Sequence, residues 1–128
     1  MEKICVDDAV KNHLAAGVPP EKLVMGLAFY GRGKKGFPRH RDLTRAHLVE
    51  GEYTFCWDSA AQVPYITDGD GELVFGYENE VSLALKGEYI VKNGLKGAMY
   101  WSYEGDNASG DLRECVFKVI NRKSERED

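Results

Sequence analysis

The sequence predicts an α/β fold that is interrupted by a small α+β insertion. Two nearly continuous apolar runs, Lys22–Tyr30 and Lys96–Trp101, are typical of strands in a parallel sheet that is covered on both faces. Between them, residues 79–94 have a helical pattern that can cross over from the first strand to the second, which completes a βαβ unit. Residues 34–78 are rich in turn signals and short β-prone segments, which favour an inserted antiparallel sheet.

The helices around these strands have recognisable ends. Asp7 or Asp8 can cap a first helix, and Gly17 can supply its left-handed C-terminal residue. Asn79 is a good N-cap for the crossover helix, and Gly94 can end it. Both helices are therefore expected to be short.

The insertion is expected to combine one helix, over residues 42–49, with strands over 53–57, 63–67 and 72–77. Tyr53 and Trp57 are expected to fill its small core. The Asp68-Gly-Asp-Gly71 segment predicts a hairpin turn between the last two strands. An adventitious metal site is the alternative there, but a calcium loop needs about 12 residues that end in a bidentate Glu.

A final helix and a disordered tail are expected at the end of the chain. Apolar residues recur with helical spacing from Leu112 to Ile120. Asp106 and Asp111 can cap this helix or order the loop before it. Residues 122–128 offer no apolar side chain to pack, so we expect them to be disordered.

The composition argues against several functions. The formal net charge of −4 speaks against nucleic acid, whose binding depends on clustered Lys and Arg. No stretch approaches the roughly 20 apolar residues of a membrane span, and Met1 is followed by no apolar signal segment. Cys5, Cys56 and Cys115 are too few and too scattered for a disulfide framework or a zinc site, so buried thiols are expected.

The three histidines do not indicate a metal centre. His13, His40 and His47 share no metal-ligand spacing, so we expect solvated or locally bonded imidazoles. We therefore expect neither a metal nor a cofactor.

Candidate binding residues lie at the ends of the two apolar strands. Trp101 closes the second run, and Tyr30 and Arg32 follow the first. Aromatic rings can stack on a polyhydroxylated ring, and a guanidinium can donate fixed hydrogen bonds to it. The alternatives are a core position for Trp101 and, for Arg32, an ion pair that bridges the strand and the insertion.

The order of short motifs resembles one enzyme family. The chain contains, in sequence, Tyr30-Gly-Arg32, Trp57-Asp58 followed by Pro64-Tyr65, Ser82-x-x-x-Lys86 and Gly97-Ala-Met-x-Trp101. Over residues 10–120 it is similar to the C-terminal part of the chitinase-type glycoside hydrolases of family eighteen. No single motif is specific, but their order is.

The resemblance implies a partial (β/α)8 TIM barrel, because 128 residues are too few for a complete barrel of roughly 250. Residues 1–33 would form a barrel helix and strand, and residues 34–78 the insertion domain. Residues 79–121 would form the last barrel helix, the last strand and a terminal helix, followed by the tail 122–128. The chain would thus contain the last two βα units.

The resemblance also implies a function. The parent protein would hydrolyse β-linked N-acetylglucosamine polymers, with a Glu as acid and the sugar's own acetamido group as nucleophile. The family's Asp-x-x-Asp-x-Asp-x-Glu run does not occur in this sequence, so no catalytic residue is expected in the chain. Trp101 would lie beneath the sugar as the floor of the groove, with Tyr30 and Arg32 as further substrate contacts. The insertion domain, which contains Tyr53 and Trp57, would form one wall of the groove. The parent would be extracytoplasmic or secreted, and this chain alone would tend to self-associate.

Two other functions remain open at this point. The same fold without its acid would be a carbohydrate-binding lectin, and the residue at the acid position of the parent decides between the two. A free-standing interaction module is the other alternative, and it requires residues 34–78 to fold alone.

Overall fold

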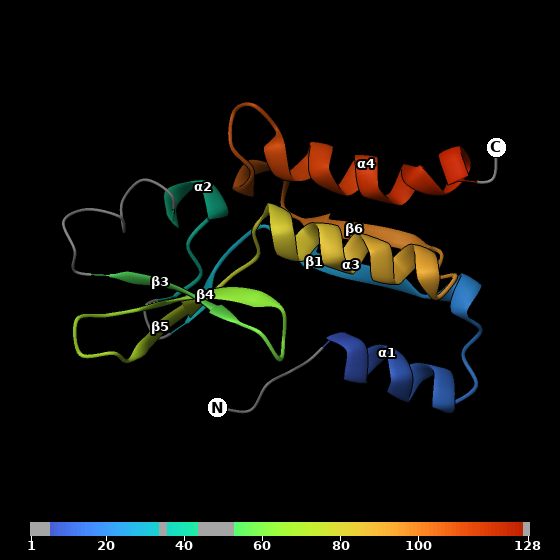
Figure 1. The fold of residues 1–128 in the computed structure, drawn as a ribbon, viewed down its shortest axis with the longest axis horizontal. Helices are drawn as coiled ribbons and strands as arrows, with labels where there is room; N and C mark the ends of the chain where they lie inside the picture. The colour runs from blue at the N-terminus through green and yellow to red at the C-terminus, as the bar shows by residue number, and fades with distance from the viewer. Residues whose placement is uncertain (1–5, 34–35, 44–52, 127–128) are drawn as a thin grey trace.

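The computed structural model describes residues 6–33, 36–43 and 53–126, with side chains as far as Asn121. Figure 1 labels most of the elements, which form two separate sheets with helices packed beside them. In chain order these are α1 (Val6–Ala15), η1 (Pro20–Lys22), β1 (Val24–Ala28), β2 (Arg32–Gly33), α2 (His40–Leu43), β3 (Thr54–Asp58), β4 (Val63–Thr67), β5 (Leu73–Gly76), α3 (Glu80–Lys92), β6 (Gly97–Trp101), η3 (Tyr103–Gly105) and α4 (Asp111–Arg126).

The first sheet consists of the two predicted parallel strands. β1 pairs with β6 in a register that runs from Val24 opposite Gly97 to Ala28 opposite Trp101. Beyond the strand, the N–H of Phe29 donates to the carbonyl oxygen of Trp101 at 2.8 Å. The C-terminal ends of the two strands are therefore joined side by side.

The crossover helix α3 has the predicted ends. Asn79 and Ser82 form a capping box, in which each side chain accepts a hydrogen bond from the other residue's backbone N–H at 2.9 Å. Gly94 follows the helix with a φ of 64°, the left-handed conformation that glycine adopts without strain. Gly17 does the same after α1, with a φ of 98°.

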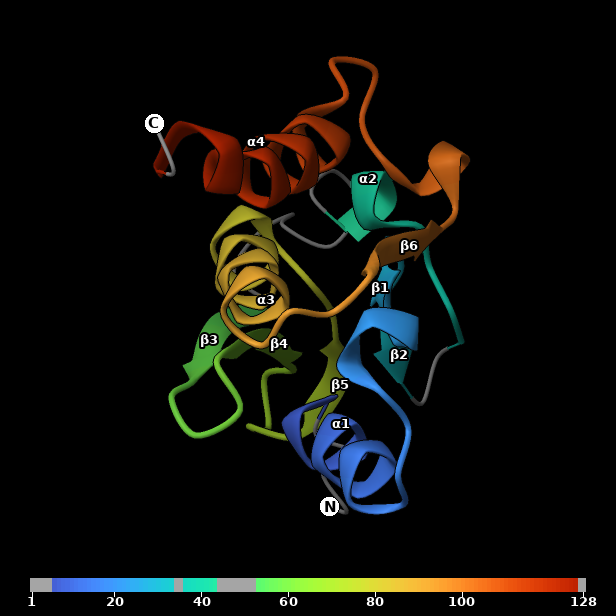
Figure 2. The ribbon, with the colours of Figure 1, turned by 90° about the vertical axis from the view of Figure 1, so that its right-hand side faces the viewer.

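The main core lies between the parallel sheet and its helices. It joins residues from α1, β1, α3, β6 and α4, which pack on one side of the strands (Figure 2). Its buried members are Val10, Met25, Leu27, Phe29, Leu83, Ile90, Leu95, Leu112 and Val116.

In the described part of the chain only one face of the two strands is covered, whereas such apolar runs are typical of strands covered on both faces. Burial alternates along β1, where Met25 and Leu27 are buried but Val24 is 47% exposed. On β6, Met99 and Trp101 are 49% and 68% exposed. Alternation arises because successive side chains point to opposite faces, and the described helices cover only one of them (Figure 2).

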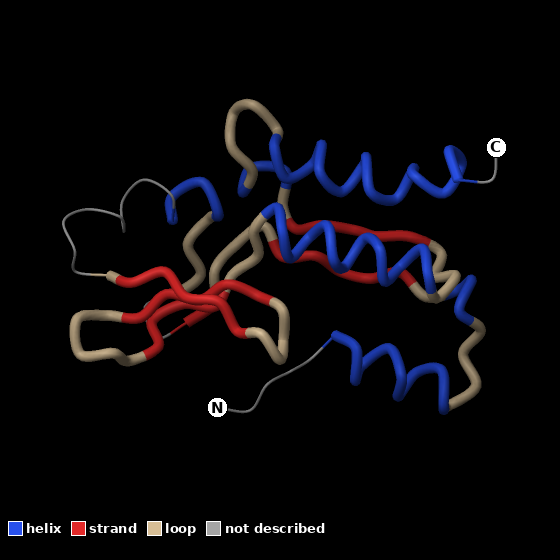
Figure 3. The backbone as a smooth tube through the Cα atoms, viewed as in Figure 1, coloured by secondary structure: helices blue, strands red, loops and turns tan. Residues whose placement is uncertain are grey.

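The second sheet is the predicted insertion. Its strand order is β2-β5-β4-β3, all antiparallel, and Figure 3 shows it lying apart from the β1–β6 pair. A separate small core of Leu43, Ile66, Val74 and Phe75 holds it together, with Tyr53 packed against it. The sheet starts at Arg32, two residues before the predicted boundary at residue 34. Residues 44–49 of the predicted helix lie outside the described residues.

The turn between β4 and β5 is a hairpin, as expected. Asp68 Oδ1 accepts hydrogen bonds from the backbone N–H groups of Asp70 and Glu72, at 2.9 and 3.0 Å. An Asp side chain that bonds to its own backbone in this way stabilises a turn. The carboxylate is thus engaged in local structure.

Two terminal features differ from expectation. Asp7 and Asp8 lie inside the first turn of α1 rather than before it, and the hydroxyl of Tyr89 donates to Asp7 Oδ1 at 2.7 Å. At the other end, α4 is helical as far as Arg126, so the expected disorder is wrong for residues 122–126. Local helix propensity is enough to continue a helix whose earlier turns are docked.

Candidate functional site

A hollow of about 320 Å³ lies where the C-terminal ends of β1 and β6 meet the start of the insertion. Three chain segments line it: the end of β1, the segment before α2, and the end of β6 with η3. The lining residues are Phe29, Tyr30, Phe37, Arg39, Trp101, Ser102 and Gly105. Two of the three predicted site residues, Trp101 and Tyr30, are therefore brought together here.

Trp101 lies at the edge of this hollow with its indole 68% exposed. It is the last residue of β6, so its side chain points to the opposite face from that of Tyr100. Tyr100 stacks on the ring of Phe29, with ring centroids 4.5 Å apart and planes 7° apart. The alternative of a buried core position for Trp101 is wrong, and its indole is free to contact a ligand.

The loop after Trp101 is held by one buried carboxylate. Asp106 is 2% exposed, and its Oδ1 accepts from the N–H groups of Asn107 and Leu112 at 2.8 and 3.0 Å. Its Oδ2 accepts from the N–H of Arg113 at 3.0 Å. Asp106 therefore both caps α4 and orders the loop, as the sequence predicted.

Tyr30 is positioned by an unexpected bridge. It pairs antiparallel with Arg39, and the flanking bonds run from Gly31 N–H to Pro38 oxygen and from His40 N–H to Phe29 oxygen. The ring of Tyr30 meets the ring of Phe37 edge to face, with centroids 6.2 Å apart. The segment before α2 thus extends the end of β1 and carries Phe37 and Arg39 into the site.

Sequence reasoning missed Phe37 and Arg39. Both follow a basic, turn-rich stretch, and the only local signal is the position of Gly36, which adopts a φ of 108°. A pattern of this kind predicts a turn but not which strand the chain returns to.

Arg32 lies outside the lining of the hollow. It begins β2, where it is opposite Gly76 and exposed. No ion pair forms at Arg32 among the described residues, so the predicted bridge between strand and insertion is not seen in that part of the chain. Its role in substrate binding stays a prediction.

His40 corrects the expectation of solvated or locally bonded histidines. It is 9% exposed, its ring lies 6.2 Å from that of Tyr77, and its Nδ1 has no hydrogen-bond partner among the described residues. Burial lowers the pKa of the imidazole, and the charge of Asp106 opposes this only in part. His13 is locally bonded as expected, with Nδ1 2.7 Å from the oxygen of Ala9, and His47 lies outside the described residues.

A buried ion pair joins the insertion to the crossover helix. Lys86 pairs with Glu78, whose other carboxylate oxygen accepts from the hydroxyl of Ser82 at 2.7 Å. Glu78 is 6% exposed, and Ser82 is fully buried. The Ser82-x-x-x-Lys86 motif therefore has a structural role at the start of α3.

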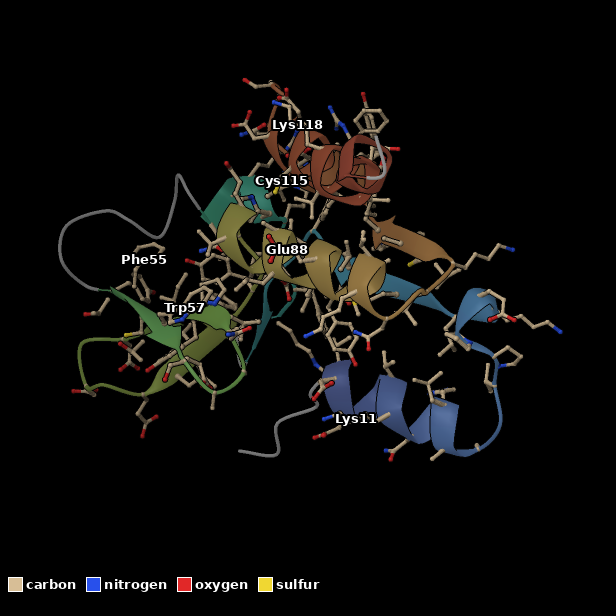
Figure 4. All side chains as sticks on the ribbon, turned by 45° about the vertical axis from the view of Figure 1, so that its right-hand side comes forward. Lys11, Phe55, Trp57, Glu88, Cys115 and Lys118 are labelled. Carbon is tan, nitrogen blue, oxygen red and sulfur yellow. The ribbon has the colours of Figure 1, made fainter. Side chains whose placement is uncertain are left out.

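The aromatic residues of the insertion do not all fill its core. Tyr53 packs against it, but Trp57 and Phe55 are 41% and 40% exposed on β3. Figure 4 shows both side chains projecting from this strand. The expectation for Trp57 is wrong, because no residue of the edge strand β3 is buried on either face.

The described residues form no disulfide and no cluster of potential metal ligands. Cys56 and Cys115 form no disulfide among the described residues and are only partly buried, so the expectation of buried thiols is wrong for these two, and Cys5 lies outside those residues. No group of three or more potential ligands among the described side chains could hold a metal ion. The described helices also include none that is long and apolar enough to cross a membrane.

The described lining can bind a ligand but contains no carboxylic acid. Trp101, Tyr30 and Phe37 supply flat apolar surfaces, and Arg39 supplies a guanidinium. No Asp or Glu is among the described residues that line the hollow. Such a set suits an uncharged ligand with flat faces and oxygen acceptors.

Comparison with known proteins agrees with this chemistry. Residues 1–106 match the sequence profile described as "Glycosyl hydrolases family 18". A curated relative, Chitinase A1 of Niallia circulans, is 32% identical over 120 residues, which cover 75% of this chain and 17% of the relative. The chain thus spans about a sixth of that protein.

Solved structures give the same result. The chitinase ChiW of a Paenibacillus species superposes with a TM-score of 0.86 at 32% identity, over 97% of this chain and 12% of that one. A Group IV chitinase of Ostrinia furnacalis, solved in complex with allosamidin, gives a TM-score of 0.78 at 28% identity, over 90% of this chain and 39% of that one.

Proposed function

Because this chain belongs to family 18 of the glycosyl hydrolases, we propose that its hollow binds chitin or N-acetylglucosamine oligosaccharides as part of a chitin-hydrolysing enzyme. The observation that carries the proposal is the exposed indole of Trp101 beside the hollow at the end of β6. An indole can bury the apolar C–H face of a pyranose ring. Tyr30 contacts the same sugar, and Arg32 contacts the chain beyond the hollow.

We further propose that the chain forms the last two βα units of a (β/α)8 barrel, with residues 34–78 as the insertion domain. The parallel β1–β6 pair with its crossover α3 supports this assignment. In such barrels, ligands bind at the C-terminal ends of the strands, where the hollow lies. The open face of the two strands would then be the barrel interior.

In the proposed reaction this chain binds substrate, and the parent supplies the acid. The sequence has no Asp-x-x-Asp-x-Asp-x-Glu run, and the described lining of the hollow has no carboxylate. Substrate-assisted retention in such a family needs one Glu to protonate the leaving oxygen, while the acetamido group attacks the anomeric carbon. Because ChiW is described as cell-surface-expressed, we place the parent outside the cytoplasm.

Binding of chitin oligosaccharides to the chain tests the proposal. Trp101→Ala should weaken binding about fivefold to thirtyfold, because the stacked indole contributes roughly 1–2 kcal/mol of buried apolar contact. Trp57→Ala is the matched control, since this second tryptophan is exposed on β3 and does not line the hollow. The proposal fails if Trp101→Ala binds like the original chain and melts normally.

A further inference from the structure

The segment before α2 places a second exposed ring beside the hollow. Phe37 is 69% exposed, close to the 68% of Trp101, and both rings line the same hollow. A single exposed apolar ring needs no explanation, but two exposed rings that line one hollow form an apolar surface that a ligand can cover. Phe37 comes from the insertion side and Trp101 from β6, so the hollow lies between two exposed aromatic surfaces.

Backbone bonds fix this segment to the end of β1. The antiparallel bridge between Tyr30 and Arg39, with bonds of 2.8 and 3.0 Å on its two sides, determines where Phe37 and Arg39 lie. Both side chains line the same hollow. The edge-to-face contact with Tyr30 further orients the ring of Phe37.

Arg39 adds a positioned donor next to this ring. Its Nε donates to Asp42 Oδ2 at 2.8 Å, yet the side chain remains 47% exposed. A guanidinium has five N–H donors in a fixed fork, so an ion pair through Nε holds it in place while leaving donors for a ligand. The oxygen of an acetamido group or a hydroxyl is a suitable acceptor.

We infer that Phe37 and Arg39 form a second sugar-binding contact, distinct from that of Trp101, which selects for longer N-acetylglucosamine oligosaccharides. This inference rests on the proposed function. A volume of about 320 Å³ is at the lower end of the roughly 300–1,000 Å³ of ligand pockets, so a long oligosaccharide must extend over the rim. Phe37 stacks on the ring that leaves the hollow, and Arg39 donates to its polar groups.

Titration of the chain with a disaccharide and a hexasaccharide of N-acetylglucosamine, followed by ligand-detected NMR, tests the inference. Phe37→Ala should weaken hexasaccharide binding about fivefold to tenfold, which corresponds to roughly 1–1.4 kcal/mol, and weaken disaccharide binding much less. Phe37→Trp should retain or strengthen hexasaccharide binding. Arg39→Gln should also weaken hexasaccharide binding more than disaccharide binding. Phe117→Ala, equally exposed on α4 but outside the hollow, is the matched control and should have no effect.

The other outcomes show whether the inference alone fails or the proposed function fails with it. If Trp101→Ala weakens both ligands and Phe37→Ala weakens neither, the second contact does not exist and the proposed function stands. If Phe37→Ala weakens both ligands equally, Phe37 belongs to the same contact as Trp101, and the length selection is refuted. If neither ligand binds the original chain, the proposed function fails, and this inference fails with it.

Discussion

Replacement of Asp106 by Asn should destabilise the whole chain, although the side chain keeps its shape. The carboxylate is 2% exposed and accepts three backbone hydrogen bonds, from the N–H groups of Asn107, Leu112 and Arg113. The substitution turns one acceptor into an NH₂ group that faces these donors and removes a charge that pairs with Arg113 at 3.6 Å. At least one buried donor is then unsatisfied.

The cost follows from the number of bonds lost. Hydrogen bonds to charged groups contribute about 1.5–3 kcal/mol each, and their losses are not additive, so we expect a loss of about 3 kcal/mol in the free energy of unfolding. With a urea slope of roughly 2 kcal/mol per M, the unfolding midpoint should fall by about 1.5 M. Urea titration by circular dichroism measures this shift.

A matched control is available in the same segment. Asp111 begins α4, is only partly buried, and accepts one side-chain bond, from Asn107 at 2.6 Å. Asp111→Asn should therefore lower the free energy of unfolding by less than about 1 kcal/mol. Equal shifts for the two variants would refute the reasoning, because burial and backbone bonding would then not determine the cost.

Three further predictions concern pH, association and catalysis. Burial lowers the pKa of His40, so below about pH 6.5 the unfolded chain binds a proton that the folded chain does not. The free energy of unfolding should therefore fall as the pH falls from about 6.5 and be level above it. Urea titrations at several pH values should show a weaker pH dependence in His40→Leu, with His13→Gln as the control for the loss of one histidine. The open face of the β1–β6 pair should cause self-association that Met99→Lys weakens and Phe117→Lys on α4 does not; sedimentation of the original chain as a monomer at all concentrations would contradict this. The chain alone should not hydrolyse chitin oligosaccharides, and turnover by a purified sample would show that an acid lies within it.

The elements of the fold could be predicted from the sequence where local signals decide them. Asn79 and Gly94 mark the ends of α3 by capping chemistry, and Asp68 marks the hairpin turn. The burial of the strands could not be predicted in this way. A continuous apolar run indicates that both faces of a strand can be buried, but it does not indicate what covers them. Val24 and Met99 are exposed because the described helices cover only one face.

The site also contains residues that local sequence patterns predict and residues that they do not. Trp101 and Tyr30 could be predicted, because each closes an apolar run and the C-terminal ends of neighbouring parallel strands lie side by side. Phe37 and Arg39 could not, because their position depends on a bridge back to Tyr30. The burial of His40 is equally non-local, since it follows from contacts with the end of β1 and with Tyr77.

Two glycines explain how three segments come close enough to form the hollow. A Cβ added at Gly31 would lie 2.9 Å from the side chain of Leu43, so the insertion packs directly on the end of β1. A Cβ added at Gly105 would collide with the carbonyl oxygen of Phe29, so η3 packs on the same strand end from the other side. Neither residue carries apolar surface or charge, which is why hydrophobic patterns and motifs overlook them. The position of Trp101 depends most on Gly105, since a side chain there would push the β6 loop off the backbone of Phe29, whereas a Cβ at Gly31 meets the end of the Leu43 side chain, which can shift.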